Sequence, residues 1–265
     1  MAERVAAVIG HPIAHSLSPA LFAEFARAAD LDLDYRAVDV RPDALGETLG
    51  RWRADARFVG CNVTMPHKKR IITFLDSCSD AARSCDAVNV VRRDGSRLVG
   101  ENTDLVGITV SLRTVGFEPS GRDAVVLGAG GAAQAVVCVL AEAKARAIAI
   151  VARNAERARS LVSRAARQYP GTRFSAVALG AEVPAAAIYV NATPLGQSGQ
   201  PYRSLLPPNT PADAVAFDLV YRPAKTPFLQ ESTARGLRTI GGFTMLLEQA
   251  LATFEAWFSF RPPLD

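Results

Sequence analysis

No uninterrupted apolar run in the sequence approaches the length of a membrane-spanning helix, which needs about 20 such residues. The first residues lead directly into a strand-like segment and carry none of the features of a secretion signal. We therefore expect a soluble, unprocessed protein of the cytoplasm that has no membrane partner.

Cysteine and histidine are scarce, with four and three residues in the whole chain. Cys61, Cys78, Cys85 and Cys138 form no CxxC pair, so the sequence indicates neither a structural zinc site nor a disulfide framework. We expect buried free thiols in a reducing compartment and no metal ion.

A block of basic residues is missing as well. The 30 lysines and arginines are scattered among 26 acidic residues, and the formal net charge is +4. Nucleic-acid-binding proteins usually cluster their basic residues, so we expect no nucleic-acid partner. A mild positive potential suits an anionic small molecule. The expected partner is therefore a small-molecule substrate, for a chain that is a monomer or a homodimer.

The sequence does contain two series of alternating strand-like and helix-like segments, the pattern of an α/β fold with largely parallel sheets. With 265 residues, 49% of them hydrophobic, the chain can bury two ordinary cores. The first series has expected strands at 4–10, 35–40, 58–64 and 87–93, with helices at 19–29 and 42–54. The second has expected strands at 123–127, 147–151, 187–191 and 214–219, with helices at 132–143 and 155–168.

The polar stretch 114–122, which contains glycine and proline, separates the two series and resembles a domain junction. The last segment, 244–258, has apolar residues spaced for one face of a helix. We expect this helix to return to the first domain.

The segment 123–133 reads as an apolar strand, a G-x-G-x-x-A turn and the start of an alanine-rich helix. In a dinucleotide-binding turn Gly128 permits the tight bend, Gly130 lets the backbone approach a pyrophosphate, and Ala133 keeps the helix close to the sheet. The free N–H groups at the helix start would hold the phosphates. This context predicts a Rossmann-type, doubly wound domain.

The end of the next strand indicates which dinucleotide is bound. A domain that prefers NAD places an acidic residue there, against the ribose 2′-hydroxyl. This chain instead has Arg153 and Arg157, one helical turn apart. Two guanidinium groups would grip a 2′-phosphate, so we expect NADP. The alternative is that both arginines are simply solvated at a helix start.

Two serines precede the first expected helix. Ser18 stands directly before Pro19 and fits an N-cap, which leaves Ser16 without a structural role. Capping and substrate binding both explain this pair.

Lys68 and Lys69 lie in the first turn of a helix that we expect to begin at Pro66. A cation at a helix N-terminus opposes the macrodipole, which disfavours the charged amine and suits it to proton transfer. Position alone does not choose between the two lysines, and surface solvation is the alternative for both.

Two further polar residues lie at strand ends or within strands of the first series. Asn89 falls inside an apolar strand, where its amide needs partners. Asp104 precedes an apolar segment and would either cap a helix or pair with a lysine. An acid and a lysine at neighbouring strand ends form a pair that moves a proton to or from a substrate oxygen during hydride transfer.

Together these stretches resemble the shikimate dehydrogenase family over nearly the whole chain. The matching motifs are SLSP (16–19), NVTMPHK (62–68), AVNVV (87–91), ENTD (101–104), GAGGAA (128–133), NATPLG (191–196), DLVYRPAKTPFL (218–229) and MLLEQA (245–250). Their order and spacing are far more specific than any single motif.

The resemblance implies an N-terminal α/β substrate domain and a Rossmann-type NADP-binding domain, with a cleft between them. The substrate-binding, catalytic domain would comprise 1–105, joined by the C-terminal helix within 240–265, and the NADP-binding domain would comprise 106–239. The implied reaction is the reversible NADPH-dependent reduction of 3-dehydroshikimate to shikimate, a step in the biosynthesis of chorismate and the aromatic amino acids.

The resemblance also implies roles for individual residues. Lys68 aligns with the family's catalytic lysine and Asp104 with its partner aspartate. The implied substrate-binding residues are Ser16, Ser18, Asn62, Thr64, Asn89, Tyr221 and Gln249. The implied cofactor-binding residues are Gly128, Ala129, Gly130, Gly131, Ala132, Arg153, Asn154, Arg157, Thr193, Leu195 and Gly242.

The chain departs from the family pattern in three places: Ala152 at the adenine-ribose turn, Leu105 after the aspartate, and Thr244 where a second glycine is usual. Two alternative functions stay open. One is a dehydrogenase of the same family that acts on quinate or an amino-substituted analogue, or that uses NAD. The other is a protein that senses the nucleotide without catalysis, against which the lysine and aspartate argue.

Overall fold

The computed structural model describes residues 3–197, 202 and 204–263, and the chain divides into two compact units. The first unit comprises the chain up to Asp104 together with the part from Leu247 onward, and the second comprises Leu105–Leu246. The division therefore falls at the start of helix α4 (Asp104–Thr114). The expected junction at 114–122 is wrong, because α4 groups with the second unit.

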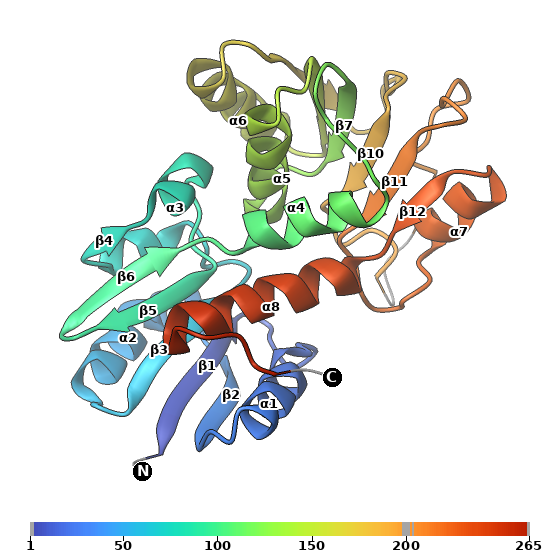
Figure 1. The fold of residues 1–265 in the computed structure, drawn as a ribbon. Helices are drawn as coiled ribbons and strands as arrows, with labels where there is room; N and C mark the ends of the chain where they lie inside the picture. The colour runs from blue at the N-terminus through green and yellow to red at the C-terminus, as the bar shows by residue number, and fades with distance from the viewer. Residues whose placement is uncertain (1–2, 198–201, 203, 264–265) are drawn as a thin grey trace. The chain divides into compact units, whose positions relative to one another are not determined.

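The first unit contains a six-stranded sheet of order β2-β1-β3-β5-β6-β4 (Figure 1). Its strands are β1 (Arg4–Gly10), β2 (Leu33–Asp39), β3 (Phe58–Val63), β4 (Ser77–Cys78), β5 (Val90–Asp94) and β6 (Arg97–Glu101). β1 pairs in parallel with β2 and β3, but β5 is antiparallel to both β3 and β6. β4 also pairs in parallel with β6, so the expected largely parallel sheet is confirmed. The antiparallel strand is β5, because a tight turn joins it to β6 and such a turn permits only antiparallel pairing.

Helices cover both faces of this sheet. They are α1 (Ser18–Ala28), α2 (Leu45–Ala54), α3 (Asp80–Cys85) and, from Leu247 onward, α8 (Gly242–Phe258), with the 3-10 helices η1 (Pro42–Ala44) and η2 (Arg70–Phe74). One core cluster joins Phe22 and Phe25 of α1 to Phe254 of α8. The other joins Leu45 and Leu49 of α2 to the opposite face of the strands. The sheet is thus buried on both faces.

The second unit contains a six-stranded sheet of order β12-β11-β10-β7-β8-β9, in which every pairing is parallel. Its strands are β7 (Asp123–Leu127), β8 (Ala147–Ala152), β9 (Arg173–Ala178), β10 (Ile188–Asn191), β11 (Val215–Asp218) and β12 (Arg238–Ile240). The strand order reverses between β7 and β10, the position at which doubly wound sheets bind dinucleotides. The predicted Rossmann-type domain is confirmed.

The helices of the second unit are α4, α5 (Gly131–Glu142), α6 (Ala155–Gln168) and α7 (Pro227–Ala234). α5 and α6 pack on β7, β8 and β9. A separate core cluster contains Phe228 and Leu229 of α7 together with Leu127 and Val151. In the described part of the chain, every helix is too short or too polar to cross a membrane.

Candidate functional site

Lys68 and Asp104 form an ion pair in the first unit, between Lys68 Nζ and Asp104 Oδ2. Their side chains are only 17% and 5% exposed. Lys68 lies in the turn between β3 and η2, where its carbonyl accepts the Val88 backbone N–H at 2.8 Å, and Asp104 begins α4. Because little solvent reaches the pair, the two charges act on each other and on a ligand more strongly than exposed charges do.

The neighbouring lysine has different surroundings. Lys69 Nζ pairs with Asp86 Oδ2 at 2.6 Å, and its side chain is 67% exposed. An exposed ion pair of this kind contributes little to stability or chemistry. The geometry therefore separates two lysines that the sequence leaves equivalent, and only Lys68 reaches Asp104.

The expected helix at Pro66 is wrong. Residues 65–69 form turns that lead into the 3-10 helix η2, so Lys68 does not lie at the N-terminus of an α-helix. The macrodipole argument for a destabilised ammonium therefore does not hold. The charged group that Lys68 Nζ contacts is the carboxylate of Asp104.

Asn89 fixes the other oxygen of the same carboxylate. Its Nδ2 donates to Asp104 Oδ1 at 2.8 Å and to Thr103 Oγ1 at 3.0 Å, and it lies 3.5 Å from Gln249 Oε1. Its Oδ1 accepts the Thr103 backbone N–H at 2.7 Å. Asn89 lies just before β5 rather than inside a strand as expected. Its backbone still bonds Glu101 and the Val63 N–H, and its side-chain amide binds the groups around Asp104.

The carboxylate of Asp104 does not cap α4. The Asn102 side chain accepts the Asp104 backbone N–H at 3.1 Å, and Asn102 Nδ2 donates to the Ala87 carbonyl at 2.8 Å. Both carboxylate oxygens are therefore held by Lys68 and Asn89. The structure brings together three of the predicted residues, Lys68, Asn89 and Asp104.

The polar network extends to three residues that the sequence analysis missed: Tyr35, Thr103 and Thr253. Tyr35 donates to Asn62 Oδ1 at 2.8 Å, and Asn62 Nδ2 donates to Thr253 Oγ1 at 3.2 Å. Thr253 Oγ1 lies 3.1 Å from Thr103 Oγ1. One signal for Thr253 was available, because it follows Gln249 by one helical turn and so shares its helix face. Asn62, predicted to bind substrate, already has protein partners on both amide atoms.

Ser18 is buried, but not as a helix cap. Leu17 occupies the N-cap position of α1, and none of the described side chains caps this helix, so the capping explanation is wrong. Loss of solvent around the Tyr35 phenol raises the pKa of Tyr35, and a hydrogen bond with Ser18 partly opposes that rise. Ser16 accepts the Ser18 backbone N–H at 3.3 Å. Both serines thus lie near the Tyr35 end of the network.

The remaining predicted substrate residues fall in both units. Thr64 directly follows β3, where its backbone N–H donates to the Ile9 carbonyl at 2.9 Å. Gln249 is buried on the part of α8 that belongs to the first unit. Tyr221 follows β11 in the second unit and is half-buried.

The glycine turn has the geometry expected of a dinucleotide site. Gly128 has φ +113°, and a Cβ on it would lie 2.9 Å from the Ala192 carbonyl oxygen. Gly130 is the N-cap of α5, and a Cβ there would meet no atom within 4 Å. Gly131 and Ala132 begin α5, and Ala129 lies within the turn. The unobstructed backbone at this helix start fits a pyrophosphate group.

The charged residues after β8 are arranged at the start of α6. Asn154 caps this helix and accepts the Arg157 backbone N–H at 2.9 Å. Arg153 and Arg157 are both exposed. The cap holds the backbone that carries the two arginines. Their side chains are exposed, so the guanidinium groups are accessible to a phosphate group.

A second buried network, which the sequence analysis missed, lies at the ends of β10 and β11. Asp218 Oδ1 accepts from Asn191 Nδ2 at 2.9 Å and from the Val220 N–H at 3.0 Å, and its Oδ2 accepts from Thr226 Oγ1 at 2.5 Å. Burial raises the pKa of Asp218 from 3.8 to about 6, against the effect of these donors. The only available signal was the presence of polar residues at strand ends in the NATPLG and DLVYRP motifs.

This network shapes the loop that carries Thr193 and Leu195. Asn191 Oδ1 accepts both the backbone N–H of Thr193 at 3.1 Å and its hydroxyl at 2.6 Å. Asn191 Nδ2 also donates to the Leu195 carbonyl at 3.0 Å. The loop conformation is therefore set by buried hydrogen bonds.

Gly242, the first residue of α8, lies against the backbone that follows β11. A Cβ on it would lie 2.5 Å from the Leu219 carbonyl oxygen. Only glycine permits so close an approach. Thr244, which stands where the family usually has a second glycine, follows on the same helix and is half-buried.

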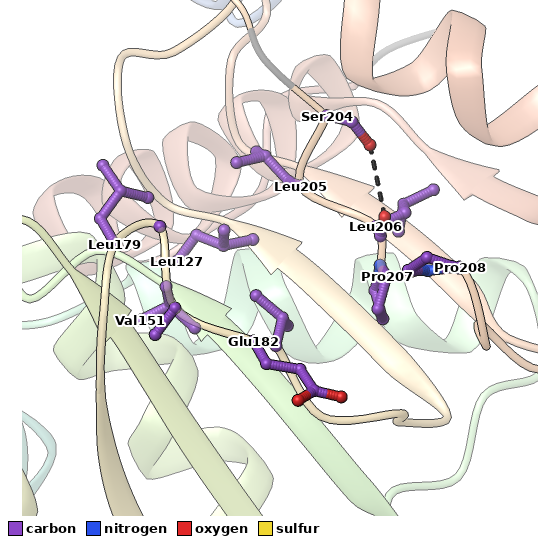
Figure 2. A pocket seen from close by; sticks show the side chains of 12 residues that line it. Leu127, Val151, Leu179, Glu182, Ser204, Leu205, Leu206, Pro207 and Pro208 are labelled. Atoms are coloured by element: carbon purple, nitrogen blue, oxygen red, sulfur yellow. Dashed lines mark hydrogen bonds between the residues drawn. The ribbon is translucent and has the colours of Figure 1, made fainter.

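A cavity of about 200 Å³ lies in the second unit, between the ends of β7 and β8 and two loops (Figure 2). Leu127, Val151, Leu179, Leu205 and Leu206 give it a largely apolar lining, and Glu182 is its acidic residue. None of the predicted site residues lines it. Within the described residues, no group of three His, Cys, Asp or Glu side chains could hold a metal ion.

Comparison with known proteins finds a family model for part of each unit. Residues 8–91 match the model of the shikimate dehydrogenase substrate binding domain, and residues 112–193 match that of shikimate / quinate 5-dehydrogenase. A shikimate dehydrogenase (NADP(+)) from Sphingopyxis alaskensis is 40% identical over 263 residues, covering 99% of this chain and 93% of the relative.

Two solved structures are similar over nearly the whole chain. Shikimate 5-dehydrogenase from Thermus thermophilus, in complex with NADP(H) and shikimate, has a TM-score of 0.83 and 36% identity, covering 98% of this chain and 95% of that one. Ligand-free 5-ketofructose reductase of a Gluconobacter species has a TM-score of 0.87 and 31% identity, covering 99% and 95%. The matched domain models and the full-length relatives show that this chain belongs to the shikimate dehydrogenase family.

Proposed function

We propose that this protein is an NADP-dependent shikimate dehydrogenase that reversibly reduces 3-dehydroshikimate to shikimate in chorismate and aromatic amino acid biosynthesis. The observation that carries the proposal is the partly dehydrated pair of Lys68 and Asp104, in a chain whose relatives are NADP-dependent shikimate dehydrogenases. A nucleotide sensor without catalysis would have no use for this pair.

Lys68 and Asp104 carry the proton in this mechanism. NADPH, when bound, supplies the hydride to C3 of the substrate. Lys68 Nζ donates a hydrogen bond to the C3 oxygen, and the Lys68–Asp104 pair delivers the proton that the resulting alkoxide requires. Asn89 holds the second oxygen of Asp104, so the carboxylate keeps one orientation throughout. Preorganised groups of this kind stabilise developing charge without reorganising.

The other polar residues of the first unit bind and orient the substrate. Ser16 and Ser18 bind the substrate carboxylate, at the Tyr35 end of the network. Thr64, Asn89 and Gln249, together with Tyr221 of the second unit, contact hydroxyl or carboxylate oxygens of the substrate. Asn62 acts mainly through its neighbours, because Tyr35 and Thr253 occupy its amide.

The second unit holds the cofactor. The backbone from Gly128 to Ala132 binds the pyrophosphate at the N-terminus of α5. Arg153 and Arg157 bind the 2′-phosphate, and Asn154 holds them in place as the cap of α6. Thr193, Leu195 and Gly242 border the nicotinamide and its ribose. On this proposal the catalytic domain is 1–105 with the helix from 240 onward, and the NADP-binding domain is 106–239.

A panel of substrates and cofactors tests the proposal. Purified protein is mixed with NADPH or NADH and with 3-dehydroshikimate, 3-dehydroquinate or 5-ketofructose. Oxidation of the cofactor is followed by the loss of reduced-nicotinamide absorbance. The reverse reaction is measured with shikimate, quinate and an amino-substituted shikimate. We expect kcat/KM to be highest for 3-dehydroshikimate with NADPH. A higher value for 3-dehydroquinate, 5-ketofructose or the amino analogue would reassign the substrate, and no turnover at all would favour the sensor.

We further propose that the protein works in the cytoplasm as a monomer or a homodimer. Analytical ultracentrifugation of the purified chain distinguishes these two states. A larger assembly would contradict the proposal.

A further inference from the structure

Thr253 is a fully buried residue on which three hydrogen bonds of the first unit converge. Its Oγ1 lies 2.8 Å from the Gln249 carbonyl oxygen, 3.1 Å from Thr103 Oγ1 and 3.2 Å from Asn62 Nδ2. It does not belong to the motifs that identify the family, since MLLEQA ends at Ala250. Its hydroxyl nevertheless links α8 to the residues around Asp104.

The direction of each hydrogen bond follows from the donors and acceptors available. A hydroxyl has one hydrogen, and the backbone carbonyl of Gln249 can only accept, so Thr253 Oγ1 donates to it. Thr253 must then accept from Asn62 Nδ2 and from the Thr103 hydroxyl. With its hydrogen committed to Thr253, Thr103 Oγ1 is an acceptor for Asn89 Nδ2.

Asn89 connects these hydrogen bonds to the pair of Lys68 and Asp104. Asn89 Oδ1 accepts the Thr103 backbone N–H. Of the three acceptors around Nδ2, Gln249 Oε1 is the most distant at 3.5 Å, so the two hydrogens of Nδ2 point to Thr103 Oγ1 and Asp104 Oδ1. Without an acceptor at Thr253, the Thr103 hydroxyl can rotate and donate to Asn89 Oδ1, which lies 3.4 Å away. The bond from Asn89 Nδ2 to Thr103 then weakens, and the amide that orients Asp104 loses one of its anchors.

We propose that Thr253 is a positioning residue for hydride transfer: its hydroxyl sets the hydrogen-bond direction through Thr103 and Asn89 and so fixes Asp104 opposite Lys68. The inference rests on the proposed function. It assigns no contact with substrate or cofactor to Thr253.

Thr48 shows what the helix bond alone contributes. Its hydroxyl donates to the Ala44 carbonyl at 2.9 Å, the same bond from one helical turn to the previous one, in a position that is also buried. Thr48 belongs to α2 in the same unit and takes no part in the network around Asp104. Thr48→Val is therefore a matched control for Thr253→Val, because both substitutions replace a buried hydroxyl with a methyl group of similar size.

The test compares Thr253→Val, Thr253→Ser and Thr48→Val with wild type. We measure kcat and the KM of each substrate for NADPH oxidation by 3-dehydroshikimate, together with the urea midpoint of each variant. We expect Thr253→Val to lower kcat about tenfold, or ~1.4 kcal/mol, with the KM for NADPH unchanged. Thr253→Ser should restore kcat to within about threefold of wild type, and Thr48→Val should match wild type in kcat.

The outcomes separate this inference from the proposed function. Wild-type protein without activity on 3-dehydroshikimate overturns the proposed function. If wild type is active, the positioning role is overturned when Thr253→Val keeps kcat within about twofold, when Thr253→Ser is no better than Thr253→Val, or when Thr48→Val loses as much. Should Thr253→Val fail to fold, Thr253→Cys replaces it, since a thiol is a weak acceptor of similar size. The kcat of Thr253→Cys must then be lower than that of Thr253→Ser, and an equal kcat overturns the positioning role.

Discussion

Asn89 Nδ2 donates to Asp104 Oδ1 across 2.8 Å, while Lys68 Nζ donates to the other oxygen of the same carboxylate. The two donors come from the segments after β3 and before β5, and the acceptor begins α4. Three separate parts of the chain thus fix one carboxylate that is only 5% exposed. Removing either charged partner leaves the other in a place where solvent compensates poorly.

Lys68→Met and Asp104→Asn should each lower kcat by roughly 10² to 10⁴, the usual contribution of a group that transfers a proton. Both substitutions nearly preserve side-chain size, so the KM for NADPH should stay close to the wild-type value. Initial rates of NADPH oxidation with 3-dehydroshikimate provide the measurement. A kcat within about threefold of wild type for either variant would show that the pair does not carry the proton.

Lys69→Met is the control for these variants. Lys69 is adjacent in sequence, but its side chain is 67% exposed and pairs with Asp86. Because exposed ion pairs contribute about 0 to 1 kcal/mol, this variant should keep wild-type kcat within about twofold. A large loss in Lys69→Met would mean that the two lysines are not separated as the structure indicates.

Arg153→Ala should discriminate between the two nicotinamide dinucleotides. A hydrogen bond to a charged group contributes about 1.5 to 3 kcal/mol, so the KM for NADPH should rise roughly 10- to 100-fold while the KM for NADH stays the same. Arg157→Ala should act in the same direction. Arg159→Ala is the control, because Arg159 is exposed on the same helix but faces away from Arg157 by the helical period. Equal losses with NADPH and NADH would rule out binding of the 2′-phosphate.

Much of the second unit follows from local signals in the sequence. The predicted helix 155–168 and strand 123–127 coincide with α6 and β7. α6 has a clear apolar stripe and a capping asparagine, and β7 is a short apolar run before a glycine turn. β9 was missed because it lies at the edge of the sheet and all of its residues are exposed or half-buried, so it lacks an apolar pattern.

The candidate site was only partly predictable for a different reason. The sequence motifs named Lys68, Asn89 and Asp104, but the choice of Lys68 over Lys69 depends on where Asp86 and Asp104 lie in space. Tyr35 lies on a segment whose pattern indicates only packing, and the one signal for Thr253 is that it shares a helix face with Gln249. The Tyr35 hydroxyl meets Asn62 of β3 within the sheet, and the Thr253 hydroxyl meets Asn62 when α8 covers the sheet. Both hydrogen bonds join segments that are far apart in the sequence.

Asp218 should make stability depend on pH in a direction opposite to that of most carboxylates. Burial raises its pKa from 3.8 to about 6 in the folded protein. Between pH 4 and 6, roughly, the folded state therefore keeps a proton that the unfolded state has released. Stability from this group is present at low pH and is lost as pH rises through 6, by about 3 kcal/mol at most.

Asp218→Asn removes that titration. Urea unfolding of both proteins at pH 4, 5, 6 and 7 gives the free-energy difference between variant and wild type at each pH. This difference should shift in favour of the variant as pH rises. Asp213→Asn, which alters a carboxylate that is 78% exposed, should show no such shift. A difference for Asp218→Asn that is constant from pH 4 to 7 would contradict a raised pKa in the folded state.

Gly242→Ala should disturb the second unit, whereas Gly241→Ala should not. A Cβ at Gly242 would lie 2.5 Å from the Leu219 carbonyl oxygen, and backbone cannot move aside as a side chain can. At Gly241 the nearest atom, Leu229 Cδ1, would be 3.8 Å away, an ordinary contact. Overpacking of this kind costs about 1 to 3 kcal/mol, so the urea midpoint of Gly242→Ala should fall and NADPH binding, measured by fluorescence, should weaken. Equal midpoints for the two variants would show that α8 begins farther from β11 than the structure places it.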